Sequence, residues 1–233
     1  KNLLINPKEI TISPYSSTSS NIDSHFFQSY DKNKLNDLKT LLNIGSFNSA
    51  IIFCNKKNDI DKVHRFLKKN NYKSVCLHGD MNQGSRTNSL EEFKNKSANI
   101  LVASDVAARG IDVKDLSHVF NYDVPNNPED YVHRIGRTGR AGKKGKAYTI
   151  FNEKDEKNVL LIEKLIKKKV KKLNIKDINF NNRNTNIKDL EKINPDKIVS
   201  KQNNKSKFLP VENFLNFQES GKIPEFLKTK KSI

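Results

Sequence analysis

The sequence predicts an α/β domain built on a doubly wound, mostly parallel sheet flanked by helices. From about residue 22 to residue 151, short apolar runs of strand length alternate with amphipathic segments of helical spacing, which is the signature of repeated βα units. The 233 residues are enough for one domain of ordinary size and an appendage. Only 35% of them are hydrophobic, so we expect one compact domain and a long solvated remainder.

Six apolar runs are candidate strands, and four amphipathic segments are candidate helices between them. The strands are predicted at 25–30, 49–54, 74–77, 99–103, 118–122 and 146–151. Two helices are predicted to start after Asp31 and Asn58, which are good N-cap residues. A third runs over about 83–95, and a fourth begins at Pro128 behind the cap residue Asn127.

After residue 151 the pattern changes to one last basic helix, predicted over about 153–172, and then to a flexible tail rich in Asn and Lys. Residues 151–233 carry 20 Lys+Arg and 11 Asp+Glu, which is +9 of the formal charge of +17. Residues 174–207 have almost no apolar periodicity, so they should be disordered. We therefore expect a linker at 1–21, the main domain at 22–172, and a basic, mostly disordered tail at 173–233.

The net charge of +17 favours a polyanionic partner, either nucleic acid or an anionic membrane surface. No run of 18 apolar residues and no amphipathic anchor occurs in the sequence, so nucleic acid is favoured and no membrane contact is expected. A lysine excess inherited from an AT-rich genome is the alternative explanation.

The two cysteines, Cys54 and Cys76, fall in short apolar runs that indicate buried strands. A free cysteine packs there as a small hydrophobic side chain, so neither a disulfide nor a metal site is expected. A reducing, cytoplasmic setting follows. The absence of an initiator Met and of a helix-start signal at Lys1 suggests that the sequence is a piece of a longer chain.

The most informative segment is the ten-residue string HRIGRTGRAG at 133–142. Its arginines, Arg134, Arg137 and Arg140, are three residues apart and leave a predicted helix for a glycine-rich loop. Guanidinium groups at this spacing can converge on one anionic target, such as a chain of phosphates. The glycines between them remove side chains where a second body must approach closely.

This string is similar to helicase motif VI in the form that DEAD-box RNA helicases use. Other segments resemble motifs of the same family in the same order. They are AIIFCN at 50–55 (motif IV), HGD at 78–80 with Gln83 and Arg86, SDVAARGID at 104–112 (motif V) and NYDVP at 121–125. Over about residues 1–170 the chain therefore resembles the second, C-terminal RecA-like domain of that family. It departs from the usual pattern at Ser104, where the family has Thr, but a hydroxyl group remains.

The resemblance implies ATP hydrolysis in a cleft between two RecA-like domains. By position in motif VI, Arg137 and Arg140 are implied to contact the γ-phosphate as arginine fingers, and thus to be both catalytic and nucleotide-binding. Asp112 matches the residue that hydrogen-bonds the ATP ribose, and Gly110 lies beside it. His133 is implied to organise the contact between the domains, although a purely structural histidine is the alternative.

The resemblance also implies a grip on the RNA backbone that does not depend on base sequence. The residues that match the family's RNA contacts are Asn55, Gly79, Gln83, Arg86, Ser104 and Arg109. A structural role remains open for each of them.

Two motifs of the complete enzymes do not occur in these 233 residues. There is no G-x-x-x-x-G-K-[ST] sequence, and the nearest run, at 79–85, lacks the lysine; there is no D-E-A-D either. Both belong to the first domain of the family. ATP and Mg²⁺ are thus the expected cofactors, and the Mg²⁺ ligands are expected in that first domain. The expected partners are RNA and the first domain itself. The chain alone is expected to be inactive.

Two other functions compete with a helicase domain. The first is a non-enzymatic RNA-binding or annealing module that uses the basic tail as its main contact surface. The second is a DNA translocase of the same superfamily, which fits less well because those proteins usually depart from HRIGRTGR. Arg137, Arg140 and Asp112 discriminate against a pure binding module, since such a module has no need of them.

Overall fold

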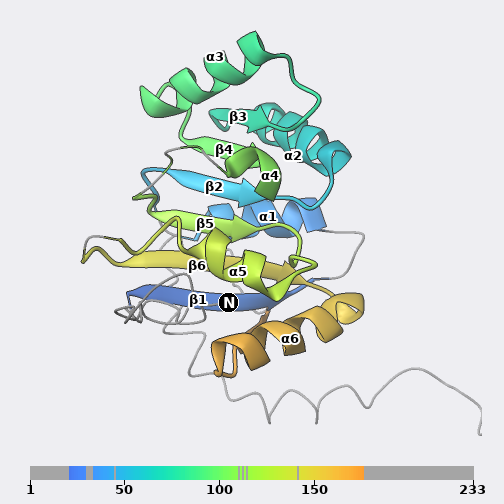
Figure 1. The fold of residues 1–233 in the computed structure, drawn as a ribbon. Coiled ribbons are helices and arrows are strands. Elements are labelled where there is room, and N and C mark those ends of the chain that lie inside the picture. The colour runs from blue at the N-terminus through green and yellow to red at the C-terminus, as the bar shows by residue number, and fades with distance from the viewer. Residues whose placement is uncertain are drawn as a thin grey trace, which may run out of the picture. The chain divides into compact units, whose positions relative to one another are not determined.

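Parallel strands form one sheet in the order β3-β4-β2-β5-β6-β1-β7, as seen for the labelled strands in Figure 1. The computed structural model describes residues 21–29, 34–44, 46–109, 111, 113, 115–140 and 142–175. Within them the strands are β1 Ile22–Gln28, β2 Ala50–Phe53, β3 Ser74–Leu77, β4 Ile100–Ala103, β5 His118–Asn121, β6 Gly145–Phe151 and β7 Lys171–Asn174. Every pair of neighbouring strands is parallel, so their carboxyl ends share one edge.

Helices cover both faces of this sheet. They are α1 Lys34–Leu42, α2 Lys57–Lys69, α3 Gln83–Lys94, α4 Asp105–Ala108, α5 Pro128–Ile135 and α6 Glu156–Ile166, with a short 3-10 helix η2 Glu153–Asp155 before α6. Apolar side chains of α1 and α2 pack on one face, and those of α3 to α6 pack on the other. Figure 1 shows α4, α5 and α6 in front of the sheet and α1 behind it. The predicted doubly wound α/β fold is confirmed.

The sheet separates two apolar cores because successive side chains along a strand point to opposite faces. In β2, Ile51 and Phe53 pack in the core under α3 to α6, whereas Ala50 and Ile52 pack in the core under α1 and α2. All four are at most 2% exposed. A strand buried on both faces gives a continuous apolar run in the sequence, which is why the central strands could be predicted from such runs.

The predicted strand and helix positions are confirmed to within a few residues. β3 has its predicted bounds, and α5 begins at Pro128 with the Asn127 side chain accepting a hydrogen bond from the Glu129 backbone. The start predicted for the second helix is wrong in detail, because its N-cap residue is Lys56 and Asn58 lies inside α2. Asn82 caps α3 by accepting from the Ser85 backbone.

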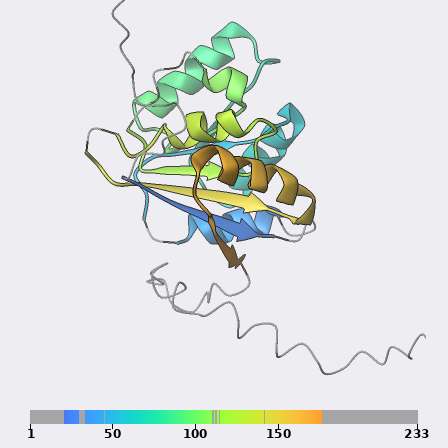
Figure 2. The same ribbon diagram turned by 60° about the horizontal axis from the view of Figure 1, so that its bottom comes forward.

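The helix predicted over about 153–172 ends earlier, at Ile166. Lys167 adopts the left-handed conformation (φ 52°) and turns the chain, and Glu163 accepts hydrogen bonds from the Val170 backbone (2.9 Å) and Lys169 Nζ (3.2 Å). The chain then forms β7, which pairs with β1 as a seventh strand at the edge of the sheet (Figure 2). Lysines favour helix in isolation, so their spacing alone did not reveal this turn.

Most of the predicted linker and tail lies outside the described residues. Of 1–21 the structure describes only Asn21, whose carbonyl accepts from the Gly145 backbone at 2.9 Å. Of 173–233 it describes 173–175, and the first two of these belong to β7. In the described part of the chain, no helix is both long and apolar enough to cross a membrane.

The start of β6 leaves no space for a side chain at Gly145. A Cβ atom there would lie 2.2 Å from Thr138 Oγ1 and 2.5 Å from the Gly139 nitrogen. We expect Gly145→Ala to lower the free energy of unfolding by about 1–3 kcal/mol, because the crowded backbone must shift. Urea unfolding followed by circular dichroism measures this change.

Gly79→Ala is the matched control, because a Cβ at Gly79 has no heavy atom within 4 Å. It should change the unfolding free energy by less than about 0.5 kcal/mol. Equal effects of the two substitutions on the free energy of unfolding would show that crowding at Gly145 does not cause the loss of stability.

Candidate functional site

The carboxyl edge of the sheet brings together residues that lie far apart in the sequence. Asn55 follows β2, Gly79 follows β3 and Ser104 follows β4. The Asn55 backbone N–H donates to Asp123 Oδ2 at 3.0 Å, and its side-chain amide donates to the Val124 carbonyl at 2.8 Å. These bonds join the loops after β2 and β5, so the edge is a connected polar surface.

Arg134 of α5 is the most highly bonded side chain of this surface. It is 1% exposed, and its Nε and Nη2 donate to the two carboxylate oxygens of Asp105 at 2.7 Å each. Nη2 also donates to Asn55 Oδ1, and Nη1 donates to the Asp123 carbonyl, both at 2.7 Å. The guanidinium group lies over the Phe53 ring, 5.2 Å from its centroid. One buried side chain thus joins α4, α5 and the ends of β2 and β5.

The three arginines of the 133–142 string therefore do not converge on one target. The expectation is wrong for Arg134, whose guanidinium is engaged inside the domain. Arg137 is half-buried and donates from Nη1 to the Ile111 carbonyl at 3.3 Å. Arg140 is exposed and donates from Nε to the Gly136 carbonyl at 2.6 Å.

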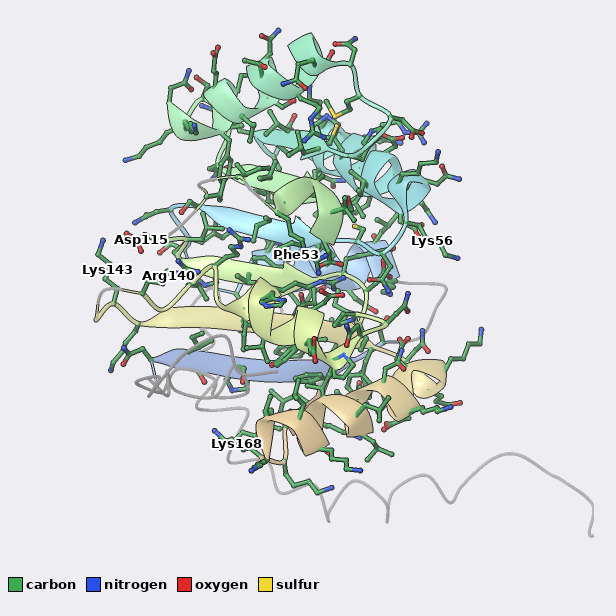
Figure 3. All side chains as sticks on the ribbon, viewed as in Figure 1. Phe53, Lys56, Asp115, Arg140, Lys143 and Lys168 are labelled. Atoms are coloured by element: carbon green, nitrogen blue, oxygen red, sulfur yellow. The ribbon has the colours of Figure 1, made fainter. Side chains whose placement is uncertain are left out.

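Arg140 lies at the edge of the sheet opposite to the RNA candidates. Figure 3 shows Arg140 and Lys143 beyond the ends where the strands begin, whereas Lys56, which follows β2, lies past the ends where they finish. The reason is that α5 leads back across the sheet and the chain must reach the start of β6 at Gly145. The surface carried by α4 and α5 connects the two edges.

A shallow depression lies on that connecting surface. Phe53, Asp105, Arg109, Asp130, His133 and Arg137 are among the residues that line it. Asp130 accepts from Arg109 Nη2 at 2.5 Å, and its carboxylate lies 3.9 Å from His133 Nδ1. Arg109 is 60% and His133 49% exposed. Both side chains are thus largely exposed, beside one shared carboxylate.

The start of α3 carries the remaining RNA candidates. Gln83 is exposed in the first turn, and half-buried Arg86 donates to the His78 carbonyl at 3.3 Å. Gly79 is exposed, and a Cβ at its position would touch nothing. Packing within the described part of the chain therefore does not require a glycine here.

Two of the sequence-predicted residues, Gly110 and Asp112, lie outside the described residues. The structure thus places nine of the eleven nucleotide, RNA and interdomain candidates, and it distributes them over two edges and the surface between. Ser104 also has a local role, because its Oγ accepts from the Ala107 backbone at 3.3 Å and caps α4. Its hydroxyl proton can still be donated to a ligand.

Sequence reasoning missed the carboxylates that hold these cations, namely Asp105, Asp123 and Asp130. Asp105 and Asp123 lie within two residues of the end of a predicted strand, which is the position where ligand-site residues gather in α/β sheets, whereas Asp130 lies in the first turn of α5. Asp123 also pairs with Lys34 Nζ at 2.6 Å. Burial, and then the Asp123 carboxylate, raise the pKa values of Cys54 and Tyr122, so both groups stay neutral beside this network.

Comparisons with known proteins agree with the geometry. The family described as helicase conserved C-terminal domain matches residues 33–142. The DEAD-box ATP-dependent RNA helicase RhpA of Helicobacter pylori is 42% identical over 179 residues, which are 77% of this chain and 36% of that protein. The chain spans about a third of the length of the curated relatives that it matches.

Solved structures of the same kind superpose on the chain. A DEAD box protein from the hyperthermophile Methanococcus jannaschii is 41% identical with a TM-score of 0.63, covering 67% of this chain and 43% of that one. The Escherichia coli DEAD-box protein SrmB, solved with the regulator of ribonuclease activity A, is 32% identical with a TM-score of 0.62. That match covers 68% of this chain and 94% of the SrmB chain.

Removing the Arg134 guanidinium should destabilise the domain strongly. Arg134→Met leaves the Asp105 carboxylate, 23% exposed, and the Asn55 and Asp123 oxygens without their donor. We expect the free energy of unfolding to fall by about 3 kcal/mol, the low end for breaking a buried ion pair, because Asp105 retains some water. Arg137→Met, at a half-buried position, should cost less than about 1 kcal/mol. Urea unfolding of both variants tests this, and similar losses would contradict the central role of Arg134.

Proposed function

The chain belongs to the DEAD-box family as its helicase C-terminal domain, and from this premise we propose that it is one half of an RNA-dependent ATPase that locally separates RNA duplexes. The observation that carries the proposal is the difference in burial among the three arginines of the 133–142 string. Arg134 is buried and neutralised inside the domain, whereas Arg140 is exposed and Arg137 half-buried. The domain thus holds two guanidinium groups at a surface that a second domain and its nucleotide can approach.

Arg137 and Arg140 suit a triphosphate substrate in chemistry and in placement. Both are permanent cations with several N–H donors, the type of group that stabilises charge on a transferring phosphoryl group. Gly139 (φ +68°) and Gly142 (φ +76°) turn the backbone on either side of Arg140 in a conformation that glycine adopts without strain. Gly110 and Asp112 are proposed to complete the nucleotide contact at the ribose.

The remaining parts of the ATP site are proposed to lie in the first RecA-like domain. The sequence contains no lysine-bearing phosphate loop and no D-E-A-D tetrapeptide, and these elements cradle the phosphates and hold Mg²⁺ in such enzymes. Within this chain, His133 and Arg109 face outward around Asp130. On this surface of α4 and α5 we assign His133 to the contact with the first domain and Arg109 to the RNA backbone.

RNA is proposed to bind along the carboxyl edge, through groups suited to phosphate and sugar rather than to bases. Ser104 offers a hydroxyl, Gly79 an open backbone, and Arg86 and Gln83 offer N–H donors at the start of α3. Asn55 differs, since its side chain already bonds both Val124 and Arg134. Its contribution is therefore to position the loop after β2.

The arginine-finger assignment is tested in a protein that contains both RecA-like domains. We expect Arg137→Ala and Arg140→Ala each to lower the RNA-stimulated ATPase rate by about 10³-fold, the low end for losing such a residue, without unfolding the domain. Lys143→Ala is the matched control, because Lys143 is an exposed cation in the same loop, and its rate should be nearly unchanged.

The 233-residue chain alone should show no ATP turnover above background. Wild-type ATPase rates in the Arg137 and Arg140 variants would show that these two arginines are not catalytic. Robust Mg²⁺-dependent hydrolysis by the isolated chain would contradict the proposed division of the ATP site between two domains.

RNA binding by the chain should be weak, tolerant of base sequence and steeply dependent on salt, because phosphates carry the contacts. Residues 176–233 contain 12 Lys+Arg and 7 Asp+Glu, and deleting them leaves the whole sheet in place. If these lysines touch RNA, the slope of log K against log salt should become shallower by about 0.7 for each lost phosphate contact. Titration of labelled single strands of different sequence at several KCl concentrations measures both properties. An unchanged slope would place 176–233 outside the RNA site, and a strong base preference would contradict backbone recognition.

A further inference from the structure

We propose that Asp61, Cys76 and His78 form a binding site for Zn²⁺ or a similar borderline divalent cation. One donor atom from each of these side chains lies within 4.8 Å of the other two. Asp61 comes from α2, Cys76 from β3 and His78 from the loop that β3 enters. The site shares no residue with the proposed ATP and RNA contacts, so its test does not depend on the proposed function.

The regular geometry of an edge strand presents these groups to one helix. Ser74, Cys76 and His78 are two residues apart, so they point to the same face of β3, and Cys76 packs against the core on the side of α2. Asp61 and His64 lie one turn apart on α2. His64 Nδ1 is 3.0 Å from Ser74 Oγ, and His78 Nε2 is 3.2 Å from Asp61 Oδ1. Cys76 therefore lies between two contacts that already join the strand to the helix.

The separation of the Asp61 and His78 donors matches that of two ligands on one metal ion. Zinc binds His nitrogen and carboxylate oxygen at about 2.0–2.2 Å, and a tetrahedral angle then separates the two donors by about 3.3–3.5 Å. The observed 3.2 Å needs almost no change. The Cys76 sulfur, bonding at about 2.3 Å, needs only a side-chain adjustment, because all three donors already lie within 4.8 Å of one another.

Hydrogen bonding within the described residues engages only one ring nitrogen of His78, the Nε2 atom that faces Asp61. The second ring nitrogen of His78, Nδ1, is buried and has no hydrogen-bond partner among the described residues. The other nearby carboxylate, on Asp80, is instead paired with Lys57 Nζ at 2.6 Å. Asp61, rather than Asp80, is therefore the carboxylate that lies beside His78 and Cys76.

The donor set determines the class of cation. Thiolate and imidazole ligands prefer Zn²⁺ and related transition metals, whereas Mg²⁺ and Ca²⁺ prefer oxygen. Three protein ligands leave a fourth position for water, as in open zinc sites. With all three side chains partly exposed, the ion can enter from solvent. Once bound, it links the middle of α2 to the residue just before Gly79.

The chain is well suited to a direct binding experiment. It has five histidines and two cysteines, and none of them lies in 1–20 or 176–233. We would titrate the reduced, untagged 233-residue chain with Zn²⁺ in competition with a chromophoric chelator. The expected result is one tightly bound ion for each chain. With Co²⁺ in place of Zn²⁺, we expect a near-ultraviolet charge-transfer band from a thiolate ligand and intense visible bands of a four-coordinate ion.

Single substitutions identify the ligands. Cys76→Ser and His78→Gln should each weaken Zn²⁺ binding by about 100-fold or more, since even outer-shell partners of a metal are worth about 10- to 100-fold. Asp61→Asn, at a side chain that is 47% exposed, should weaken binding without affecting folding. The matched controls are His64→Gln, on the same helix, and Cys54→Ala, at the other cysteine. Both should retain the ion, and circular dichroism verifies that each variant is folded.

Several results would overturn the site. They are the absence of stoichiometric Zn²⁺ binding, a Co²⁺ spectrum of the unaltered chain without a thiolate band, and equal affinity in Asp61→Asn or Cys76→Ser. The Co²⁺ spectrum needs no variant, so it remains decisive even if a substitution disturbs the edge strand. If the site is overturned, Asp61 and His78 form a simple pair beside an unrelated thiol.

Discussion

The buried guanidinium of Arg134 is the constraint on which the working surface of this domain depends. A charge that is 1% exposed is tolerated only when its donors are satisfied, and here two go to Asp105, one to Asn55 and one to the Asp123 carbonyl. The planar, forked geometry of arginine permits all of these bonds at once, which a lysine could not. Three segments that lie apart in the sequence are thereby fixed against one another, and the interaction is strong because little water competes with it.

The fixed position of α5 determines where the other two arginines lie. The helix carries Arg134 near the carboxyl edge, where Asn55 follows β2 and Asp123 follows β5. Beyond it the chain returns to the start of β6, so Arg140 emerges at the opposite edge (Figure 3). Close packing around Gly145 and Thr138 anchors the far end of this loop. The nucleotide contacts proposed for Arg140 and the RNA contacts proposed for the carboxyl edge therefore use different groups of the domain.

The edge of the sheet shows the same dependence on tertiary contacts. From the sequence, Cys76 is predicted to be a core residue, and His78 is part of a motif that resembles the family's HGD element. No metal site was expected at either residue. Asp61 lies fifteen residues before Cys76 in the numbering, on a helix whose rotation decides whether it faces the strand. Only the packing of α2 on β3 brings the three donors within 4.8 Å. A ligand set that draws on two elements at this spacing leaves no local pattern to recognise.

The sequence by itself determined the fold class, the positions of the central strands and the resemblance of residues 133–142 to a helicase motif. It could do so because these features are local: a doubly buried strand is a continuous apolar run, and Asn127 with Pro128 specifies a helix start wherever it occurs. The tertiary structure alone decided which arginine is buried, that the chain after Lys167 turns into a strand, and which carboxylates hold the cations. These outcomes depend on contacts between segments far apart in the sequence, such as Asn55 with Arg134, which are 79 residues apart, and Lys34 with Asp123, which are 89 residues apart. No short-range propensity distinguishes a paired arginine from an exposed one, because the pairing energy exists only once the partners have been brought together.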